Sequence, residues 1–116
     1  MEGYKVFISD WDWGKGITII KDDASCYLRF HINKEDMDVA HFTIVEVAPE
    51  VRRNGLCKAI WGKAEDVAKN LGCKLIIGYA QKENVCFNWY LKIGMRVDSE
   101  KDENGYYKLV KHFNHN

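Results

Sequence analysis

The most informative stretch of the chain is Val47-Ala48-Pro49-Glu50-Val51-Arg52-Arg53-Asn54-Gly55-Leu56-Cys57-Lys58. It leads from an apolar, strand-like segment through a polar turn into a segment with helical periodicity. The first turn of a helix has backbone N–H groups without partners, and the helix dipole adds partial positive charge there. Together with two arginines, these groups predict a socket for a phosphate or pyrophosphate.

The length and composition of the chain restrict the class of protein. A chain of 116 residues fits one compact domain, so we expect a single domain over residues 1–116. Apolar residues make up 47% of the sequence, which is enough for a hydrophobic core and excludes a disordered chain. The 17 basic residues balance the 17 acidic ones, so no overall field attracts nucleic acid or an anionic membrane. An anion site must therefore be local.

Cysteine usage and the N-terminus predict a cytoplasmic protein. No two cysteines have the spacing of a CxxC motif, and Met1–Lys5 begins no apolar signal segment. No apolar run approaches the length that crosses a membrane. We therefore expect reduced thiols and no metal site. The cysteines and histidines, which look like scattered residues, are Cys26, Cys57, Cys73, Cys86, His31, His41, His112 and His115.

Hydrophobic patterning predicts four strands before the opening stretch. Apolar and polar residues alternate over Cys26–Ile32, as is typical of a half-buried strand. Asp10–Gly16 is predicted to be a turn that exposes Trp11 and Trp13, and Asn33–Asp38 to be an acidic loop. The four predicted strands are Tyr4–Ile8, Ile17–Ile20, Cys26–Ile32 and His41–Val47.

After the opening stretch the pattern changes to helix, strand, helix and two short strands. A helix is predicted over Gly55–Leu71, with apolar residues on one face and Gly72 just past its end as a cap. A strand–helix–strand crossover then joins Val47 to Leu75, so these two strands should be parallel neighbours. The later predicted elements are a buried strand Lys74–Ala80, a helix Glu83–Ile93 ended by Gly94, and strands Met95–Val97 and Tyr106–Val110.

Two motifs in this order resemble the GNAT superfamily of N-acetyltransferases. The acetyl-CoA loop of that family is written Arg/Gln-x-x-Gly-x-Gly/Ala after a Val-x-Pro, and here Arg52–Cys57 follows Val47-Ala48-Pro49. The second signature, Phe-Tyr-x-x-x-Gly-Phe, is matched by Trp89–Met95. One predicted helix and one predicted strand separate the two motifs, as in the family. The resemblance covers Phe42–Val110.

The resemblance implies an α/β fold of the α+β type, with a mixed, largely antiparallel central sheet around a β-α-β core that binds acetyl-CoA. The chain departs from the family at Cys57, where Gly or Ala is usual, and at Met95, where an aromatic residue is usual. The two helices that build one wall of the family's acceptor site are missing, because only a short turn separates the first two predicted strands. A large acceptor, a second subunit in a homodimer, or the turn with Trp11 and Trp13 would complete such a minimal site.

The resemblance also implies how acetyl-CoA would be held as the cosubstrate. Loop N–H groups would bind the pyrophosphate, with charge-assisted contacts from Arg52 and Arg53, and backbone groups of Val45–Val47 would meet the pantetheine arm. Cys57 leaves two interpretations: a thiol activated at a helix N-terminus, or a small residue beneath the pyrophosphate. We favour the second, because no histidine and acid partner lies nearby in the sequence. The predicted cofactor-binding residues are Val45, Val47, Arg52, Arg53, Asn54, Gly55, Leu56, Cys57, Lys58 and Tyr90.

Two residues are candidates for proton transfer during acetyl transfer to an amine. A phenol is protonated at neutral pH, so Tyr90 is the predicted general acid that protonates the leaving thiolate. Glu46 is the predicted base, because family members often carry a carboxylate on this strand. His41 and Glu83 are rival bases, and an amine that is already neutral in the site would need none.

The sequence therefore predicts an acetyl-CoA-dependent N-acyltransferase that transfers an acetyl group to an amine by direct attack. The partners expected are a CoA thioester and an amine acceptor, either a small molecule or a protein, with no nucleic acid and no membrane. The alternative is a GNAT-fold module, catalytically weak or inactive, that binds CoA or a partner protein. The missing helical wall keeps that alternative open.

Overall fold

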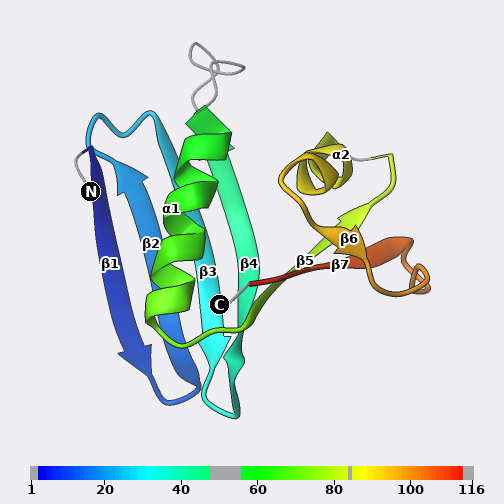
Figure 1. Cartoon of the computed structure of the whole chain (residues 1–116), viewed down its shortest axis with the longest axis horizontal. Helices are drawn as coiled ribbons and strands as arrows, with labels where there is room; N and C mark the ends of the chain where they lie inside the picture. Colours follow the sequence, from blue (N-terminus) through cyan, green and yellow to red (C-terminus); the bar gives the residue numbers. More distant parts are fainter. Residues whose placement is uncertain (1–2, 48–55, 84, 114–116) are drawn as a thin grey trace.

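In the part of the chain that the structure describes, the protein has a seven-stranded sheet with two helices (Figure 1). The computed structural model describes residues 3–47, 56–83 and 85–113. The strands lie in the order β1-β2-β3-β4-β5-β7-β6. The elements in chain order are β1 (Tyr4–Trp11), β2 (Gly14–Lys21), β3 (Cys26–Asn33), β4 (Asp36–Val47), α1 (Leu56–Asn70), β5 (Leu75–Gln81), α2 (Val85–Lys92), β6 (Arg96–Val97) and β7 (Tyr106–His112).

The first four strands form an antiparallel meander with short turns. β1 pairs with β2 over its whole length, from Tyr4 opposite Lys21 to Trp11 opposite Gly14. Gly14 has a φ of 148°, and a Cβ there would lie 2.0 Å from the backbone oxygen of Ile32. Only glycine fits that close approach between the β1–β2 turn and β3. The turn between the two strands consists of two residues, Asp12 and Trp13.

Strict alternation in β3 gives the meander two different faces. Every second side chain of β3, beginning with Cys26, is buried. The residues between them, including Arg29 and His31, point to the opposite face and are exposed or half-buried. We call the buried side the inner face and the opposite side the outer face. The inner face is covered by α1, which crosses it in Figure 1.

The crossover through α1 has the predicted form. β5 lies next to β4 and runs parallel to it, which confirms the expected β-α-β unit. α1 ends in the cap predicted from Gly72, whose φ is 96°. The Gly72 N–H donates to the Lys69 carbonyl, and the Cys73 N–H donates to the Ala68 carbonyl. This pair of hydrogen bonds defines a Schellman motif.

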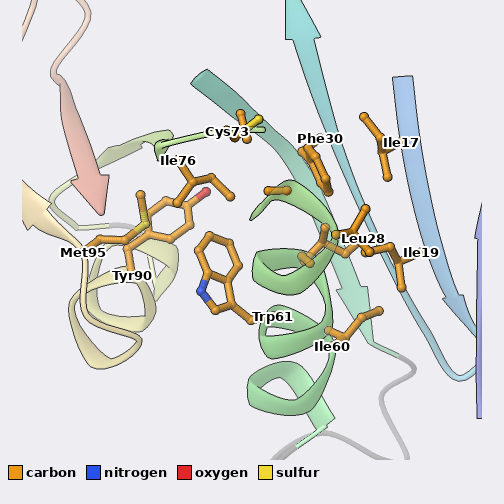
Figure 2. Packing of buried hydrophobic residues seen from close by; sticks show 14 of the residues in the cluster. Ile17, Ile19, Leu28, Phe30, Ile60, Trp61, Cys73, Ile76, Tyr90 and Met95 are labelled. Carbon is orange, nitrogen blue, oxygen red and sulfur yellow. The ribbon is translucent and has the colours of Figure 1, made fainter. Parts of the chain in front are cut away.

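One hydrophobic core lies between the inner face and the helices (Figure 2). Burial of these side chains is the main favourable term for folding. A smaller cluster of Val39, Ile77 and Val110 is separate from it. The largest fully buried side chains of the main core are Phe30, Ile17, Ile19, Leu28, Ile32, Ile60, Ile76 and Leu109.

The four strands of the meander and β7 are longer than the sequence pattern predicts. β1 extends to Trp11 and β4 begins at Asp36, so the predicted acidic loop Asn33–Asp38 is wrong. The ladder continues through Asn33 opposite Asp36, leaving only Lys34 and Glu35 between the strands. Polar residues at these ends do not interrupt pairing, because the backbone hydrogen bonds do not depend on side-chain polarity. α2 is shorter than predicted, with a turn at Lys82 and Glu83.

Two further observations bear on the predicted environment. Cys26 and Cys73 are buried, and Cys73 is a free thiol. Burial raises the pKa of the Cys73 thiol to about 11, so it stays protonated at neutral pH. In the part of the chain that the structure describes, no helix has the length and apolar character needed to span a membrane.

Candidate functional site

The parallel strands β4 and β5 separate after a short stretch of pairing. Only three residue pairs join them, and the last is His41 opposite Ile77. Beyond that pair β4 continues beside β3 as far as Val47, while β5 continues beside β7 (Figure 1). From Phe42 onward, β4 therefore has a ladder partner on its β3 side alone within the described residues. The separation leaves a row of backbone groups available to an extended ligand.

Tyr90 lies at this separation, on the inner side. The side chain of Tyr90 is 5% exposed, and its ring makes an edge contact with Phe42 of β4 at 5.5 Å between centroids. On the other side, the ring rests on Gly78 of β5: a Cβ at Gly78 would lie 3.0 Å from Tyr90 Cζ and 3.3 Å from the phenol oxygen. Tyr90 thus contacts both separating strands. Figure 2 shows its hydroxyl pointing away from Met95 towards Ile76.

The end of α2 explains the spacing of the second sequence motif. The Gly94 N–H donates to the Leu91 carbonyl, and the Met95 N–H donates to the Tyr90 carbonyl. Gly94 has a φ of 99°, which a side chain would strain. These hydrogen bonds form a second Schellman motif. In it, the Met95 side chain packs back against Tyr90 (Figure 2). The spacing Tyr-x-x-x-Gly-Met therefore fixes where Tyr90 sits in the last turn.

Aromatic rings and one carboxylate tie the two helices together around Tyr90. Trp61 of α1 meets Trp89 of α2 edge-on at 5.4 Å. The indole N–H of Trp61 donates to the Glu65 carboxylate at 2.5 Å. The Lys111 ammonium of β7 donates to the same carboxylate oxygen at 2.6 Å and to the Ile93 carbonyl at 3.0 Å. We call Trp61, Glu65 and Lys111 the clamp, because it joins α1, β7 and the end of α2.

A pair of histidines lies on the outer face at the same separation. The His31 and His41 rings stack with centroids 4.9 Å apart, which corrects the expectation that the histidines are scattered. Nδ1 of His31 is hydrogen-bonded to Oγ1 of Thr43 at 3.2 Å. Burial, and then the charge of His41, lowers the pKa of His31. Burial also lowers the pKa of His41, with Asp36 and Lys108 acting in opposite directions. Both rings therefore favour the neutral form at pH 7.

The predicted site residues are spread along β4 and the start of α1. Val45 and Val47 pair with Leu28 and Cys26 of β3, and Glu46 pairs with Tyr27. Leu56 and Cys57 are the first residues of α1, and the side chain of Lys58 is exposed. Tyr90 comes to the strand separation as described above, and Glu83 lies in an exposed turn. The remaining loop residues, Arg52, Arg53, Asn54 and Gly55, lie outside the described residues.

The structure also assigns positions to residues that sequence reasoning missed. Gly78 interrupts an otherwise apolar strand, which often marks a close approach by another group; that signal was available and its partner is Tyr90. Glu65 and Lys111 are 46 residues apart, and neither belongs to a local pattern. Phe42 looks like any other strand residue in the sequence. Their roles depend on contacts between distant elements.

Comparison with known proteins agrees with this geometry. The family model described as "Acetyltransferase (GNAT) family" matches residues 3–95. The chain belongs to the GNAT acetyltransferase family. A comparison with curated proteins finds no match for this GNAT chain.

Solved structures share the fold of this GNAT chain at low sequence identity. The PaiA N-acetyltransferase of Thermoplasma acidophilum, in complex with coenzyme A, is 18% identical with a TM-score of 0.70, and the match covers 84% of this chain but 60% of that protein. A GNAT acetyltransferase of Elizabethkingia anophelis with acetyl-CoA bound is 12% identical with a TM-score of 0.71, covering 97% and 100%. A Bacillus subtilis acetyltransferase in complex with CoA is 17% identical with a TM-score of 0.67, covering 88% and 78%. The mixed, mostly antiparallel GNAT fold expected from the sequence is thus confirmed.

Proposed function

We propose that this protein is an acetyl-CoA-dependent N-acyltransferase in which an amine attacks the thioester directly. The observation that carries the proposal is the separation of β4 from β5 at His41, with the Tyr90 phenol against Gly78 on the second strand. Membership of the GNAT family supports the reaction class. A thioester between the strands would have a proton donor on the inner side and neutral imidazoles on the outer side.

The binding of acetyl-CoA is supported by the side of β4 that has no ladder partner among the described residues from Phe42 onward. An extended pantetheine arm carries amide groups, and these match the backbone groups of β4 from Phe42 to Val47. We propose that Val45 and Val47 supply such contacts, and that Arg52–Lys58, leading into α1, hold the pyrophosphate. Three GNAT structures of the same fold, from T. acidophilum, E. anophelis and B. subtilis, hold CoA or acetyl-CoA.

The proposed step balances without any further reactant. The amine nitrogen attacks the carbonyl carbon, a C–N bond forms, and the C–S bond breaks. The amine proton passes to the base, and the phenol proton of Tyr90 passes to the departing thiolate. The products are an N-acetyl amide and free CoA. Return of the proton from the base through water restores Tyr90 for the next turnover.

For the base we propose His41 in preference to Glu46. Tyr90 packs against Phe42, so the reacting atoms would lie beside that part of β4. His41 is the adjacent residue, whereas Glu46 is four residues further along, or about 13 Å along an extended strand. The lowered pKa of His41 keeps its imidazole neutral and able to accept a proton. Glu46 and the exposed Glu83 remain alternatives for the experiment.

The test is release of free CoA from acetyl-CoA in the presence of a panel of amines. We expect Tyr90→Phe to lower kcat by about 10²-fold or more, whereas Tyr79→Phe, at an exposed tyrosine of β5, should leave it unchanged. His41→Gln should lower kcat strongly and Glu46→Gln should not. Full activity in Tyr90→Phe would remove the phenol from the mechanism. A loss confined to Glu46→Gln would make Glu46 the base.

A second candidate function is a module that binds CoA, or a partner protein, without turnover. It is favoured by the missing helical wall, since a two-residue turn joins β1 to β2. This candidate predicts a raised melting temperature with CoA but no release of CoA with any amine. No thermal shift with either CoA or acetyl-CoA at saturating concentration would contradict both candidates. We place either function in the cytoplasm, in keeping with the buried free thiol of Cys73.

A further inference from the structure

The outer face of the β1–β4 meander carries a groove that the family motifs do not explain. Its volume is about 770 Å³, within the range of small-molecule sites. Its lining includes Trp11 and Trp13 as well as Thr43 of β4. We call it the outer groove. It lies on the face opposite α1.

Two exposed indoles line the outer groove, and we call them the platform. Trp11 is 60% exposed and Trp13 is 49% exposed, although both belong to residue types that are usually well buried. Gly16 lies beneath them: a Cβ there would lie 3.5 Å from Trp11 Nε1 and 3.9 Å from Trp13 Cη2. The glycine lets both indoles lean over the sheet. Exposed indoles above a floor without a side chain can stack on a flat apolar ring.

The polar part of the outer groove selects for negative charge. Arg29 projects from the outer face of β3, two residues from His31, and its guanidinium lies over the Tyr27 ring at 5.6 Å. Among the described residues that line the groove, Arg29 carries the only permanent charge, and none is acidic. A guanidinium suits a carboxylate, which it can bind through two parallel hydrogen bonds. A polycation would find no carboxylate on that lining.

The outer groove leads to the proposed reaction centre. Gly16, His31 and His41 lie opposite one another in one row across β2, β3 and β4. The Trp13 ring meets His31 edge-on at 5.8 Å, and His31 stacks on His41. With strands about 4.8 Å apart, Gly16, which lies beneath the platform, is about 10 Å from His41 across the sheet. A ring on the platform would thus place an amine on a short side chain near His41.

We propose that the outer groove binds the acetyl acceptor, and that this acceptor is an aromatic amine carrying a carboxylate, such as an aromatic amino acid. The ring would stack on Trp11 and Trp13, the carboxylate would pair with Arg29, and the amine would face His41. The role of the bound amine as the acetyl acceptor rests on the proposed acetyltransferase function. Binding of the ring and carboxylate can be measured without turnover.

The first experiment measures binding by calorimetry, with L-phenylalanine as the probe and CoA present. L-Phenylalaninamide removes the carboxylate and L-alanine removes the ring, and spermidine represents a polycation. We expect L-phenylalanine to bind about tenfold or more tightly than each of the other three. Arg29→Gln should abolish the preference over the amide. Arg96→Gln is the matched control, because Arg96 is an exposed arginine on β6, outside the groove.

The second experiment separates this inference from the proposed function. CoA release is measured with the same four amines in the wild type, in Trp13→Leu and in Tyr106→Leu, an exposed aromatic control on β7. A higher kcat/KM for L-phenylalanine, lost in Trp13→Leu alone, supports both proposals. Binding of L-phenylalanine without CoA release would support the outer groove as a binding site and contradict the proposed acetyltransferase activity. CoA release with spermidine or L-alanine, at a kcat/KM equal to or higher than that for L-phenylalanine, would support the acetyltransferase activity. It would overturn the inference about the acceptor.

Discussion

The two faces of the β1–β4 meander use the same strands in opposite ways. On the inner face, side chains such as Ile19 and Leu28 are completely buried beneath α1. On the outer face, Phe7, Trp11 and Trp13 are 49% to 60% exposed. The strand period of two residues sends neighbouring side chains into these different environments. The comparison teaches that the inner face stabilises the fold. The side chains of the outer face are therefore available to bind a ligand.

The largest expected effect comes from two phenylalanines, one on each face. Phe30→Ala removes a ring that is 1% exposed in the core, and we expect the free energy of unfolding to fall by about 3–5 kcal/mol. Phe7→Ala removes a ring that is 55% exposed, and the change should stay within about 0.5 kcal/mol. Urea unfolding at one pH measures both. Similar losses in the two variants would mean that the outer face is covered in solution.

The next effect comes from Gly78, at the inner side of the strand separation, compared with Gly62 of α1. Gly78→Ala places a methyl group 3.0 Å from the Tyr90 ring, so we expect a loss of about 1–3 kcal/mol and a lower kcat as the phenol moves. Gly62→Ala is the control, since a Cβ there meets nothing within 4 Å and α1 should gain up to about 1 kcal/mol. Unchanged stability and kcat in Gly78→Ala would show that Tyr90 does not depend on this contact.

A smaller effect separates the clamp from an ordinary surface ion pair. Glu65 and Lys111 are 13% and 28% exposed at 2.6 Å, whereas Asp38 and Lys74 are 58% and 67% exposed at 3.7 Å. A double-mutant cycle with Glu65→Gln and Lys111→Met should give a coupling energy of about 1 kcal/mol. The same cycle with Asp38→Asn and Lys74→Met should give about 0–0.5 kcal/mol. Equal couplings would remove the clamp as a link between the helices and β7.

The smallest effect is a pH dependence of stability from the outer face. His41 is faced by His31, Asp36 and Lys108, and its pKa in the folded protein is lower than the usual value of about 6.5 in an unfolded chain. The unfolded chain therefore binds more protons below about pH 6.5, so acid favours unfolding. The loss should begin near that pH and be complete below the folded pKa.

The measurement compares the midpoint of urea unfolding at pH 7.5 and pH 5.5. His41→Gln should reduce the drop between the two values, while His112→Gln, at an exposed histidine of β7, should not. An undiminished drop in His41→Gln would mean that other groups, such as His31 alone, cause the acid sensitivity.

Sequence reasoning succeeded wherever a local pattern was complete. The two glycine caps, the parallel crossover from Val47 to Leu75 and the alternating strand Cys26–Ile32 all follow from the spacing of a few neighbours. It failed at Asn33–Asp38, where a polar sequence concealed a continuing ladder. It also gave no sign that His31 and His41 meet, because strand register decides which distant residues lie opposite one another.

By itself, the sequence determined the family and the order of elements, because motif spacing and hydrophobic period act over a few turns or residues. It also determined that Tyr90 sits in the last turn of α2, through the cap at Gly94. Only the tertiary structure decided where β4 and β5 separate, that Gly78 receives the Tyr90 ring, and that the tryptophans and the histidine pair share one face. These relations join residues far apart in the chain, and packing between elements, not local propensity, sets them.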